Sequence, residues 1–201
     1  AELIGKLSDG QLEASIQATD FSAQSAGRLQ WTDAKQAYNA QSFQVQVNEF
    51  GTWRLQAPMQ IQLTDDSYQF SPFCLGNINH SAHVCAEDAV SAIAIDGREF
   101  PLFLLQPWLN NAGKEFTYSG NATLKGELSK DFSLSGAGFV NLHAPVLKIG
   151  VKSTAENEVT RIDDVRLEAN WFGQRIAAKR RATLPQRGFI EGQLNSGFSD
   201  N

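Results

Sequence analysis

The sequence has no hydrophobic run long enough to cross a membrane as a helix. No apolar stretch approaches the roughly 20 residues that a spanning helix needs. The first ten residues also lack the charged-then-apolar pattern of a secretory signal peptide. We expect the chain to be a segment of a longer protein, with any export signal or membrane anchor outside it.

Catalytic motifs are missing as well. The 201 residues include three histidines and two cysteines, and they contain no glycine-rich phosphate loop, nucleophile elbow or zinc-binding helix. The adjacent carboxylates Asp65-Asp66 and Asp163-Asp164 are expected in turns, and His143 is expected at a strand end. Neighbouring strand residues point to opposite faces, so neither pair predicts a metal or acid–base site. We expect a protein that is not an enzyme and that needs no cofactor or metal.

A strong charge of one sign is absent. The 17 basic and 22 acidic residues give a net charge of −5 and are interspersed along the chain, which argues against nucleic acid as a partner. The one basic cluster, Lys179-Arg180-Arg181, is flanked by alternating apolar positions. We interpret this cluster as a solvated strand edge and not as a phosphate site.

The sequence is rich in alternation of apolar and polar residues. Apolar residues occupy every second position in segments such as 12–18, 43–47, 147–151 and 165–171, which is the pattern of strands with one buried face. Turn residues separate successive segments, so the sequence predicts an antiparallel meander. In the more polar stretch from Ser25 to Ala40, Leu29 and Trp31 could begin a short strand, and the rest of the stretch receives no assignment.

Both cysteines lie within a predicted hairpin at residues 70–95. Cys74 and Cys85 are separated by a polar, turn-forming segment that includes His80 and His83. These four side chains are possible zinc ligands, but the order C-x5-H-x2-H-x-C is not among the usual structural zinc patterns. A disulfide is the simpler interpretation, and it indicates an oxidising compartment such as the bacterial periplasm.

One short helix is predicted after the hairpin, at residues 101–110. A turn is expected at Asp96-Gly97, and Pro101 suits the first turn of a helix. Pro107 is expected to kink or end the helix. Its apolar side chains surround it on nearly every side, so the helix needs an apolar trough to lie in. The helix residues assigned to the trough are Leu102, Leu105, Trp108 and Leu109.

The apolar strand faces need more cover than one short helix supplies. An antiparallel sheet buries an apolar face by packing on a second sheet, by closing into a barrel, or by curling into a trough open to a ligand. A loose Gly-x-Leu repeat, as in Gly5 to Leu12 and Gly188 to Leu194, predicts an elongated sheet that grows by adding strands. We favour the trough, because an extended apolar surface is typical of a binding site.

A family resemblance adds to this interpretation. The cysteine pair, the short strand at 92–95, the segment from Phe100 to Leu109 and the strand from Tyr118 to Leu128 together resemble the TamB family, which is related to the AsmA-like proteins. The resemblance is best over residues 70–130. It implies a β-taco, a long sheet curled into an open hydrophobic groove, and it implies no catalytic residues.

The resemblance also implies a cellular setting and partners. TamB-like proteins are anchored in the inner membrane, span the periplasm and partner the outer-membrane barrel TamA. They have been linked to the assembly of outer-membrane β-proteins, including autotransporters, and to phospholipid transfer between the membranes. We therefore expect phospholipid acyl chains or extended client strands in the groove, with the anchor and the TamA contact in other parts of the full protein.

These patterns predict an all-β chain that forms a single groove segment over residues 1–201, with one short helix. The residues expected to line the groove are Phe43, Val45, Val47, Leu55, Ile61, Leu63, Leu147, Ile149, Val151, Leu167 and Trp171. The alternative is a closed β-sandwich that acts as an adhesion or carbohydrate-binding module. The aromatic residues of its exposed sugar platform would be Trp31, Trp53, Tyr68 and Trp171.

Overall fold

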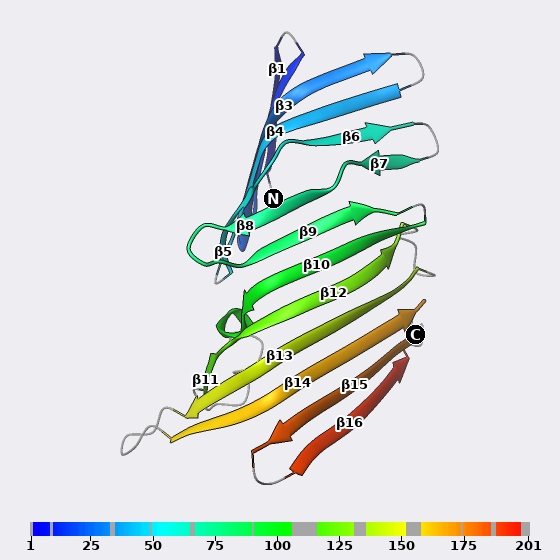
Figure 1. Ribbon diagram of the computed structural model, residues 1–201. Helices are drawn as coiled ribbons and strands as arrows, with labels where there is room; N and C mark the ends of the chain where they lie inside the picture. Colours follow the sequence, from blue (N-terminus) through cyan, green and yellow to red (C-terminus); the bar gives the residue numbers. More distant parts are fainter. Residues whose placement is uncertain are drawn as a thin grey trace. The chain divides into compact units, whose positions relative to one another are not determined.

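The computed structural model describes residues 2–8, 10–32, 35–48, 50–64, 67–89, 91–105, 116–130, 136–151, 158–173, 175–185 and 188–197. In this part of the chain the fold is all-β, and the strands pair antiparallel (Figure 1). The predicted fold class is therefore confirmed as far as an open antiparallel sheet that does not close into a barrel. Among these residues, no helix has the length and hydrophobicity that a membrane span requires.

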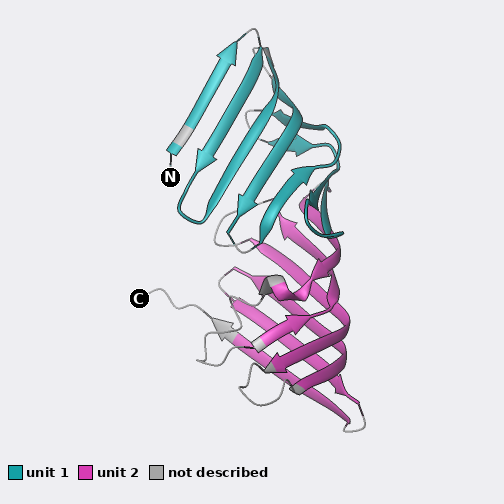
Figure 2. Cartoon of the chain, turned by 90° about the vertical axis from the view of Figure 1, so that its left-hand side faces the viewer, with its two compact units in different colours: residues 1–88 teal, residues 89–201 magenta. Residues whose placement is uncertain are grey.

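The chain divides into two compact units, Ala1–Asp88 and Ala89–Asn201 (Figure 2). The sequence predicted a single segment over the same residues. Within each unit, the described strands belong to one hydrogen-bonded ladder.

Unit 1 is a branched sheet. Its described strands are β1 (Glu2–Ser8), β2 (Gln11–Gln17), β3 (Phe21–Thr32), β4 (Lys35–Val47), β5 (Gly51–Leu55), β6 (Met59–Leu63), β7 (Tyr68–Phe70), β8 (Phe73–Asn77) and β9 (His83–Asp88). They pair in the order β1-β2-β3-β4-β5-β8-β9, while β6 pairs with β4 and β7 pairs with β6. Strand β4 is the branch point, because its first half pairs with β6 and its second half pairs with β5.

The long hairpin of β3 and β4 includes the stretch that the sequence left mostly unassigned. Its register shifts by one residue, because Ala26 pairs with Ser42 but Gly27 pairs with Ala40. Gln41 is therefore the extra residue of a β-bulge. After the extra residue, side chains that would have pointed to one face of the sheet point to the other. The apolar and polar positions in the sequence then stop alternating regularly at the bulge, and this regular alternation is the signal by which a strand is predicted.

Unit 2 is a meander with one short branch. Its described elements are β10 (Ala92–Pro101), the 3-10 turn η1 (Leu102–Leu105), β11 (Phe116–Ser119), β12 (Asn121–Ser129), β13 (Ala137–Val151), β14 (Glu158–Phe172), β15 (Arg175–Leu184) and β16 (Gly188–Gly197). The strand order is β10-β12-β13-β14-β15-β16, and β11 pairs with β13 beyond the end of β12. Strands β13 and β14 pair along their whole length of 15 residues, so they form the centre of this unit.

The helix predicted at residues 101–110 is not found in the described part of the chain. Strand β10 continues through Asp96-Gly97, where a turn was expected, and it ends at Pro101. Only the 3-10 turn follows, and it includes Leu105. Trp108 and Leu109 lie outside the described residues.

Tertiary contacts of Leu102 explain why no helix begins at this residue. The backbone N–H of Leu102 donates a hydrogen bond of 2.9 Å to the carbonyl oxygen of Gly120. Its side chain is 4% exposed and belongs to a buried cluster with Ala122 and Ala144. This segment is therefore held against β12 and β13, and such packing routinely overrides helix propensity.

Three further expectations are corrected in unit 2. His143 lies in the middle of β13 and not at a strand end. Asp163-Asp164 lies within β14 and not in a turn, whereas Asp65-Asp66 falls outside the described residues. The basic cluster Lys179-Arg180-Arg181 lies in β15, which pairs with β14 on one side and with β16 on the other, so it is not on an edge strand.

Candidate binding surfaces

Strand pairing places the apolar residues of unit 1 on one side of its sheet. Residues that lie directly opposite each other in an antiparallel pair point to the same side. Val45 pairs with Ala23 on one neighbouring strand and with Trp53 on the other, and Leu55 pairs with Leu75. We call this side the apolar face of unit 1, and it includes Leu12, Ile16, Phe21, Phe43, Val45, Val47, Trp53, Leu55, Ile61, Leu63, Tyr68, Phe70 and Leu75.

The six groove residues predicted in unit 1 all lie on this face. Phe43, Val45 and Val47 alternate along the second half of β4, and Leu55 follows on β5. Ile61 and Leu63 lie on β6, which pairs with the first half of β4. The bulge at Gln41 is what places both halves of β4 in phase, because it turns the apolar residues before it and after it to the same side.

The apolar face of unit 1 stays partly open to solvent. Leu63 is 45% exposed and Phe21 is 41% exposed, and Leu7, which pairs with Leu12 on this face, is 48% exposed. Among the described residues of unit 1, the fully buried apolar side chains are Ala40, Trp53 and Ala82. Contiguous exposed apolar surface on a folded protein usually marks a site of interaction.

The opposite side of unit 1, its polar face, is lined mostly by amide, hydroxyl and charged side chains, with the exposed Ile4 among them. There Arg54 Nε donates a hydrogen bond of 2.6 Å to Gln44 Oε1. A shallow hollow of about 470 Å³ has Lys6, Glu13 and Arg54 in its lining. The predicted groove residues Phe43 and Leu55 are also in the lining of this hollow.

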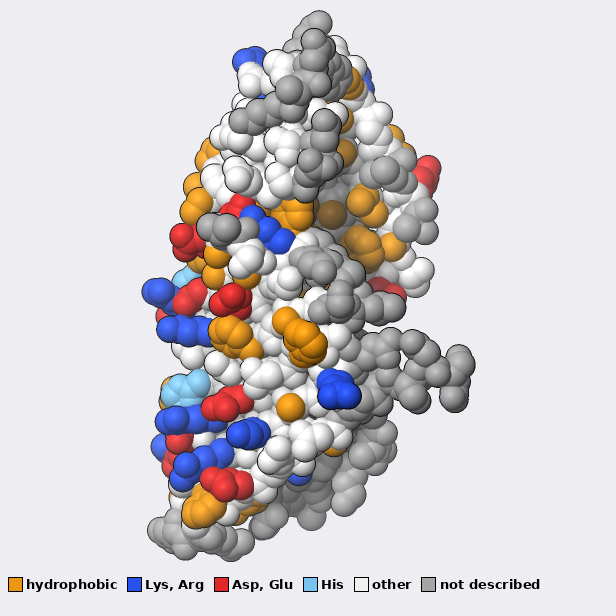
Figure 3. All heavy atoms as spheres, turned by 90° about the vertical axis from the view of Figure 1, so that its right-hand side faces the viewer, with side chains coloured by type: hydrophobic (Ala, Val, Ile, Leu, Met, Phe, Trp, Pro, Cys, Tyr) orange, Lys and Arg blue, Asp and Glu red, His pale blue; other side chains and the backbone are white. Residues whose placement is uncertain are grey.

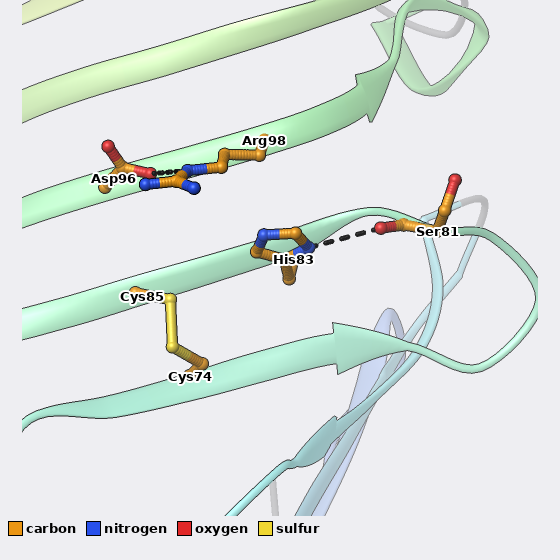
Figure 4. The surroundings of a disulfide bond; sticks show 6 residues. All are labelled: Cys74, Ser81, His83, Cys85, Asp96 and Arg98. Carbon is orange, nitrogen blue, oxygen red and sulfur yellow. Dashed lines mark hydrogen bonds and ion pairs between the residues drawn. A yellow bond between two sulfur atoms is a disulfide. The ribbon is translucent and has the colours of Figure 1, made fainter.

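The two cysteines form a disulfide that leaves the apolar face free. Cys74 and Cys85 are directly opposite each other in β8 and β9, and their sulfur atoms are bonded at 2.02 Å (Figure 4). In β8 the cysteine alternates with Leu75, so the bridge lies on the polar side. His83 Nδ1 lies 3.2 Å from the carbonyl oxygen of Ser81, and no group of three or more possible metal ligands occurs in the described ranges. The bridge therefore fixes the register of the hairpin without occupying the binding surface.

Unit 2 has an apolar face of the same kind. Leu142 pairs with Leu124 on β12 and with Leu167 on β14, and Trp171 pairs with Ile176. We call this side the apolar face of unit 2, and it includes Ile93, Ile95, Ala122, Leu124, Leu128, Val140, Leu142, Ala144, Val165, Leu167, Ala169, Trp171, Ile176 and Ala178. Leu167 is 41% exposed, so this surface is also partly open.

Strand β13 contains a bulge of its own. Thr123 pairs with His143 and Ser119 pairs with Lys148. From Ser119 to Thr123 there are four residue steps, whereas from His143 to Lys148 on β13 there are five. Strand β13 therefore has one extra residue, near Pro145. The bulge changes the phase of β13 between Leu142 and Leu147.

The change of phase brings the second half of β13 onto the apolar face. Leu147 packs against the buried cluster that also contacts Leu142, and Ile149 follows it two residues later. Strand β14 bulges at the same level, because its register with β15 shifts between Asp163 and Arg166. The predicted groove residue Val151 ends β13, where its backbone pairs with Phe116 of β11; its side chain lies outside the described part.

Charged side chains gather on the polar side of this bulge. Asp164 Oδ1 accepts a hydrogen bond of 2.9 Å from Arg166 Nε and lies 2.9 Å from His143 Nε2. The preceding residue, Asp163, accepts a hydrogen bond of 2.7 Å at Oδ1 from Arg161 Nε. Acidic, basic and histidine side chains lie interspersed in the lower half of Figure 3, which is unit 2. The opposite charges offset one another, so this cluster stabilises the bulge and does not form a single-sign site.

The electrostatics of Asp164 reflect these contacts. The hydrogen bond from Arg166 lowers the pKa of the Asp164 carboxyl below its usual value of 3.8, and the hydrogen bond with His143 acts in the same direction. Desolvation opposes both effects. The aspartate therefore remains an anion in neutral solution and joins the side chains of Arg166 and His143.

Arg180 is a candidate binding residue that the sequence interpretation misplaced. It pairs with Leu167 on β14 and with Gly192 on β16, so it lies on the apolar face of unit 2. The signal was present in the sequence, because Arg180 continues the alternation of Ile176 and Ala178. Grouping it with its two basic neighbours as one cluster hid this difference.

Comparison of the chain with family models, with curated proteins and with solved structures found no match. The resemblance to the TamB family therefore rests on the residues quoted for it above. Independent of that resemblance, each unit is an open sheet with one apolar and one polar face.

Proposed function

We propose that this chain is a periplasmic segment of a TamB-like protein whose apolar faces shield the acyl chains of phospholipids that move between the inner and outer membranes. One observation carries the proposal, namely that each unit is an open amphipathic sheet with large apolar side chains left exposed. In this proposal the inner-membrane anchor lies outside these residues. The contact with a TamA-like outer-membrane barrel is likewise made by other parts of the full protein.

Acyl chains match such a surface chemically. Each methylene removed from water contributes about 0.8 kcal/mol, so shielding about ten of them offers roughly 8 kcal/mol before the cost of ordering the chain. Phe43, Val45 and Leu55 present half-buried apolar side chains at successive positions on neighbouring strands. The polar faces keep the other side of each sheet in contact with water.

Unpaired sheet edges support a second occupant, an extended client strand. Strand β1 pairs with β2 along its whole length, and β16 does the same with β15. Neither has a second neighbour among the strands described. An edge strand accepts an added strand through its free backbone groups, so the same segment could chaperone β-strands of outer-membrane proteins or autotransporters during assembly.

The closed sandwich with a sugar platform has less support. Trp53 is only 8% exposed, and its Nε1 donates a hydrogen bond of 3.0 Å to the carbonyl oxygen of Phe50. A platform for a sugar ring needs exposed aromatic faces, and this tryptophan is packed into the sheet. The side chain of Trp31 lies outside the described part of the chain.

Native mass spectrometry of the full protein, purified from bacterial inner membranes with parallel lipid extraction, tests the proposal. We expect copurified phospholipid, and we expect Val45→Arg or Ile149→Arg to reduce it about tenfold or more, because a charge placed on either apolar face must be desolvated by the bound chain. Gln46→Arg is the matched control, since Gln46 adjoins Val45 but is exposed on the polar side.

Two outcomes would contradict the lipid proposal. One is a wild-type protein that carries no lipid, and the other is lipid retained equally by Val45→Arg and Gln46→Arg. A lipid-free protein whose outer-membrane function is abolished by Lys6→Pro in the edge strand β1 would favour the client-strand version instead.

A further inference from the structure

Arg180 is a single cation surrounded by apolar side chains on the apolar face of unit 2. Leu167 and Gly192 lie directly opposite it on the two neighbouring strands. The positions next to it along its own strand and diagonally across the ladder are held by Ala178, Ala182, Val165, Ala169, Ile190 and Leu194. No residue in this surrounding set carries a negative charge.

The two basic residues beside Arg180 in the sequence are differently placed. Lys179 pairs in register with Glu168, and Arg181 Nε lies 3.5 Å from Glu191 Oε1. These four residues are in the lining of a shallow hollow of about 510 Å³, and so are Arg180 and Gly192, which lie between them on β15 and β16. Arg180 has no such partner, because no hydrogen bond or ion pair joins its guanidinium to another residue of the described ranges.

Glycine at position 192 makes room for the guanidinium. A Cβ atom on Gly192 would lie 2.7 Å from Arg180 Nε and 3.4 Å from Arg180 Nη2. The guanidinium therefore extends across the surface of β16 at the gap that Gly192 leaves. On β16 this gap lies between Ile190, which is 51% exposed, and Leu194, which is 63% exposed.

We propose that Arg180 binds the phosphate group of a phospholipid whose acyl chains lie on the surrounding apolar face. This inference rests on the proposed function and deepens it, because it names the polar end of the ligand and the residue that holds it. The planar guanidinium donates two parallel hydrogen bonds to a phosphate, which is the geometry that arginine provides and lysine does not.

Charge complementarity selects this ligand over an uncharged one. A cation among apolar side chains is stabilised by an anion that arrives with apolar chains attached, since those chains remove water from the same surface. A free phosphate ion gains the charged contact but none of the apolar burial. An uncharged amphiphile gains the burial but leaves the guanidinium without a partner.

Binding of two amphiphiles to the full protein tests the inference. Lysophosphatidylglycerol and an uncharged maltoside of equal chain length are titrated below their micelle concentrations by calorimetry. We expect Arg180→Gln to weaken binding of the lysophospholipid about tenfold, which corresponds to roughly 1.4 kcal/mol, and to leave maltoside binding unchanged. Arg180→Lys keeps the charge and is expected to give an intermediate loss.

The matched control is Lys179→Gln, which removes the same charge from the neighbouring residue on the polar face. Equal weakening by Lys179→Gln and Arg180→Gln would overturn the inference, because it would indicate general attraction to a cationic surface. Equal loss of both amphiphiles in Arg180→Gln would also overturn it, since the side chain would then contribute only its aliphatic stem.

Two results separate this inference from the proposed function. If the maltoside binds and the lysophospholipid has no advantage over it, the apolar face is a binding surface but Arg180 is not a phosphate site. If neither amphiphile binds the wild-type protein, the proposed function itself fails. Inorganic phosphate that binds as tightly as the lysophospholipid would make Arg180 a site for free anions and would overturn the lipid assignment.

Discussion

The two units meet the same structural problem in different ways. Each has a long strand whose alternation changes phase, and each must keep its apolar residues on one side of the sheet. In unit 1 the change occurs at Gln41, between the uncharged pairs Ala26–Ser42 and Gly27–Ala40. In unit 2 it occurs beside Asp164, which has a positive φ of 50° and is held by His143 and Arg166.

This difference teaches that a bulge can be maintained by steric fit or by polar contacts. The bulge of unit 1 depends on the absence of a side chain, so we expect it to respond to residue size. The bulge of unit 2 depends on a carboxylate that joins an arginine and a histidine, so we expect it to respond to pH. The experiments below test this contrast within one chain.

The largest effect is expected from Gly27→Ala. A Cβ atom at this position would collide with the carbonyl oxygen of Asn39 and would lie 2.9 Å from Ala40 Cα. Because backbone atoms must move to relieve this contact, the free energy of unfolding of unit 1 should fall by more than about 3 kcal/mol. Urea unfolding followed by hydrogen exchange, read out separately for each unit, measures the loss.

The matched control for this change is Gly5→Ala in β1. A Cβ atom on Gly5 would lie 3.9 Å from the carbonyl oxygen of Glu13, which is ordinary contact distance. If Gly27→Ala were no more destabilising than Gly5→Ala, the steric account of the first bulge would be wrong.

The next largest effect is expected from removing the disulfide, which occurs only in unit 1. Cys74→Ser combined with Cys85→Ser releases a bridge with a sequence separation of 11 residues. In the chain-entropy model, this should lower the free energy of unfolding of unit 1 by about 3 kcal/mol. Hydrogen exchange should show lost protection in β8 and β9, with protection retained in β13 and β14. Equal loss of protection in both units would mean that they unfold as one.

The smallest effect is expected from acid, and it should be confined to unit 2. The hydrogen bond from Arg166 holds the pKa of Asp164 below its usual value of 3.8, so the unfolded chain takes up this proton more readily than the folded chain. The stabilisation is therefore complete above the unfolded pKa and is lost as the pH falls through the lowered folded pKa. Hydrogen exchange of β13 and β14, followed as the pH falls through the pKa of Asp164, measures the loss of this stabilisation.

Asp164→Asn should remove this acid-dependent step from unit 2. Asp96→Asn serves as the control, because Asp96 also accepts a hydrogen bond from an arginine, Arg98 (Figure 4), but lies in β10 and not in β14. An acid profile that is unchanged in Asp164→Asn would show that the carboxylate does not stabilise the second bulge.

How much of this fold could be predicted depended on where the strands change phase. Phe43, Val45 and Val47 alternate without interruption after the bulge, and the sequence placed them on one face. The residues before Gln41 belong to the same strand, but the extra residue breaks their alternation and no strand was assigned there. Local periodicity cannot register a bulge, because pairing with another strand determines where the extra residue lies.

The predicted helix failed for a related reason. A run of apolar residues after Pro101 fits a buried helix as well as it fits a strand end that packs on neighbouring strands. Contacts of Leu102 with Gly120 and with the cluster around Ala144 decide between the two, and those partners are distant in the sequence. The position of Arg180, by contrast, follows from alternation alone and could have been predicted.

The branch at β4 has a consequence for how such a sheet can change in evolution. The chain leaves β5, forms the β6–β7 hairpin, and returns at β8, which pairs directly with β5. The hairpin is thus a lateral extension whose strand pairing with the main ladder is to the first half of β4, while the backbone N–H of Phe70 also donates a hydrogen bond of 3.1 Å to Asp88 Oδ2 on β9. Lengthening or losing it would change the width of the apolar face while preserving every strand pair between β1 and β9 along that ladder.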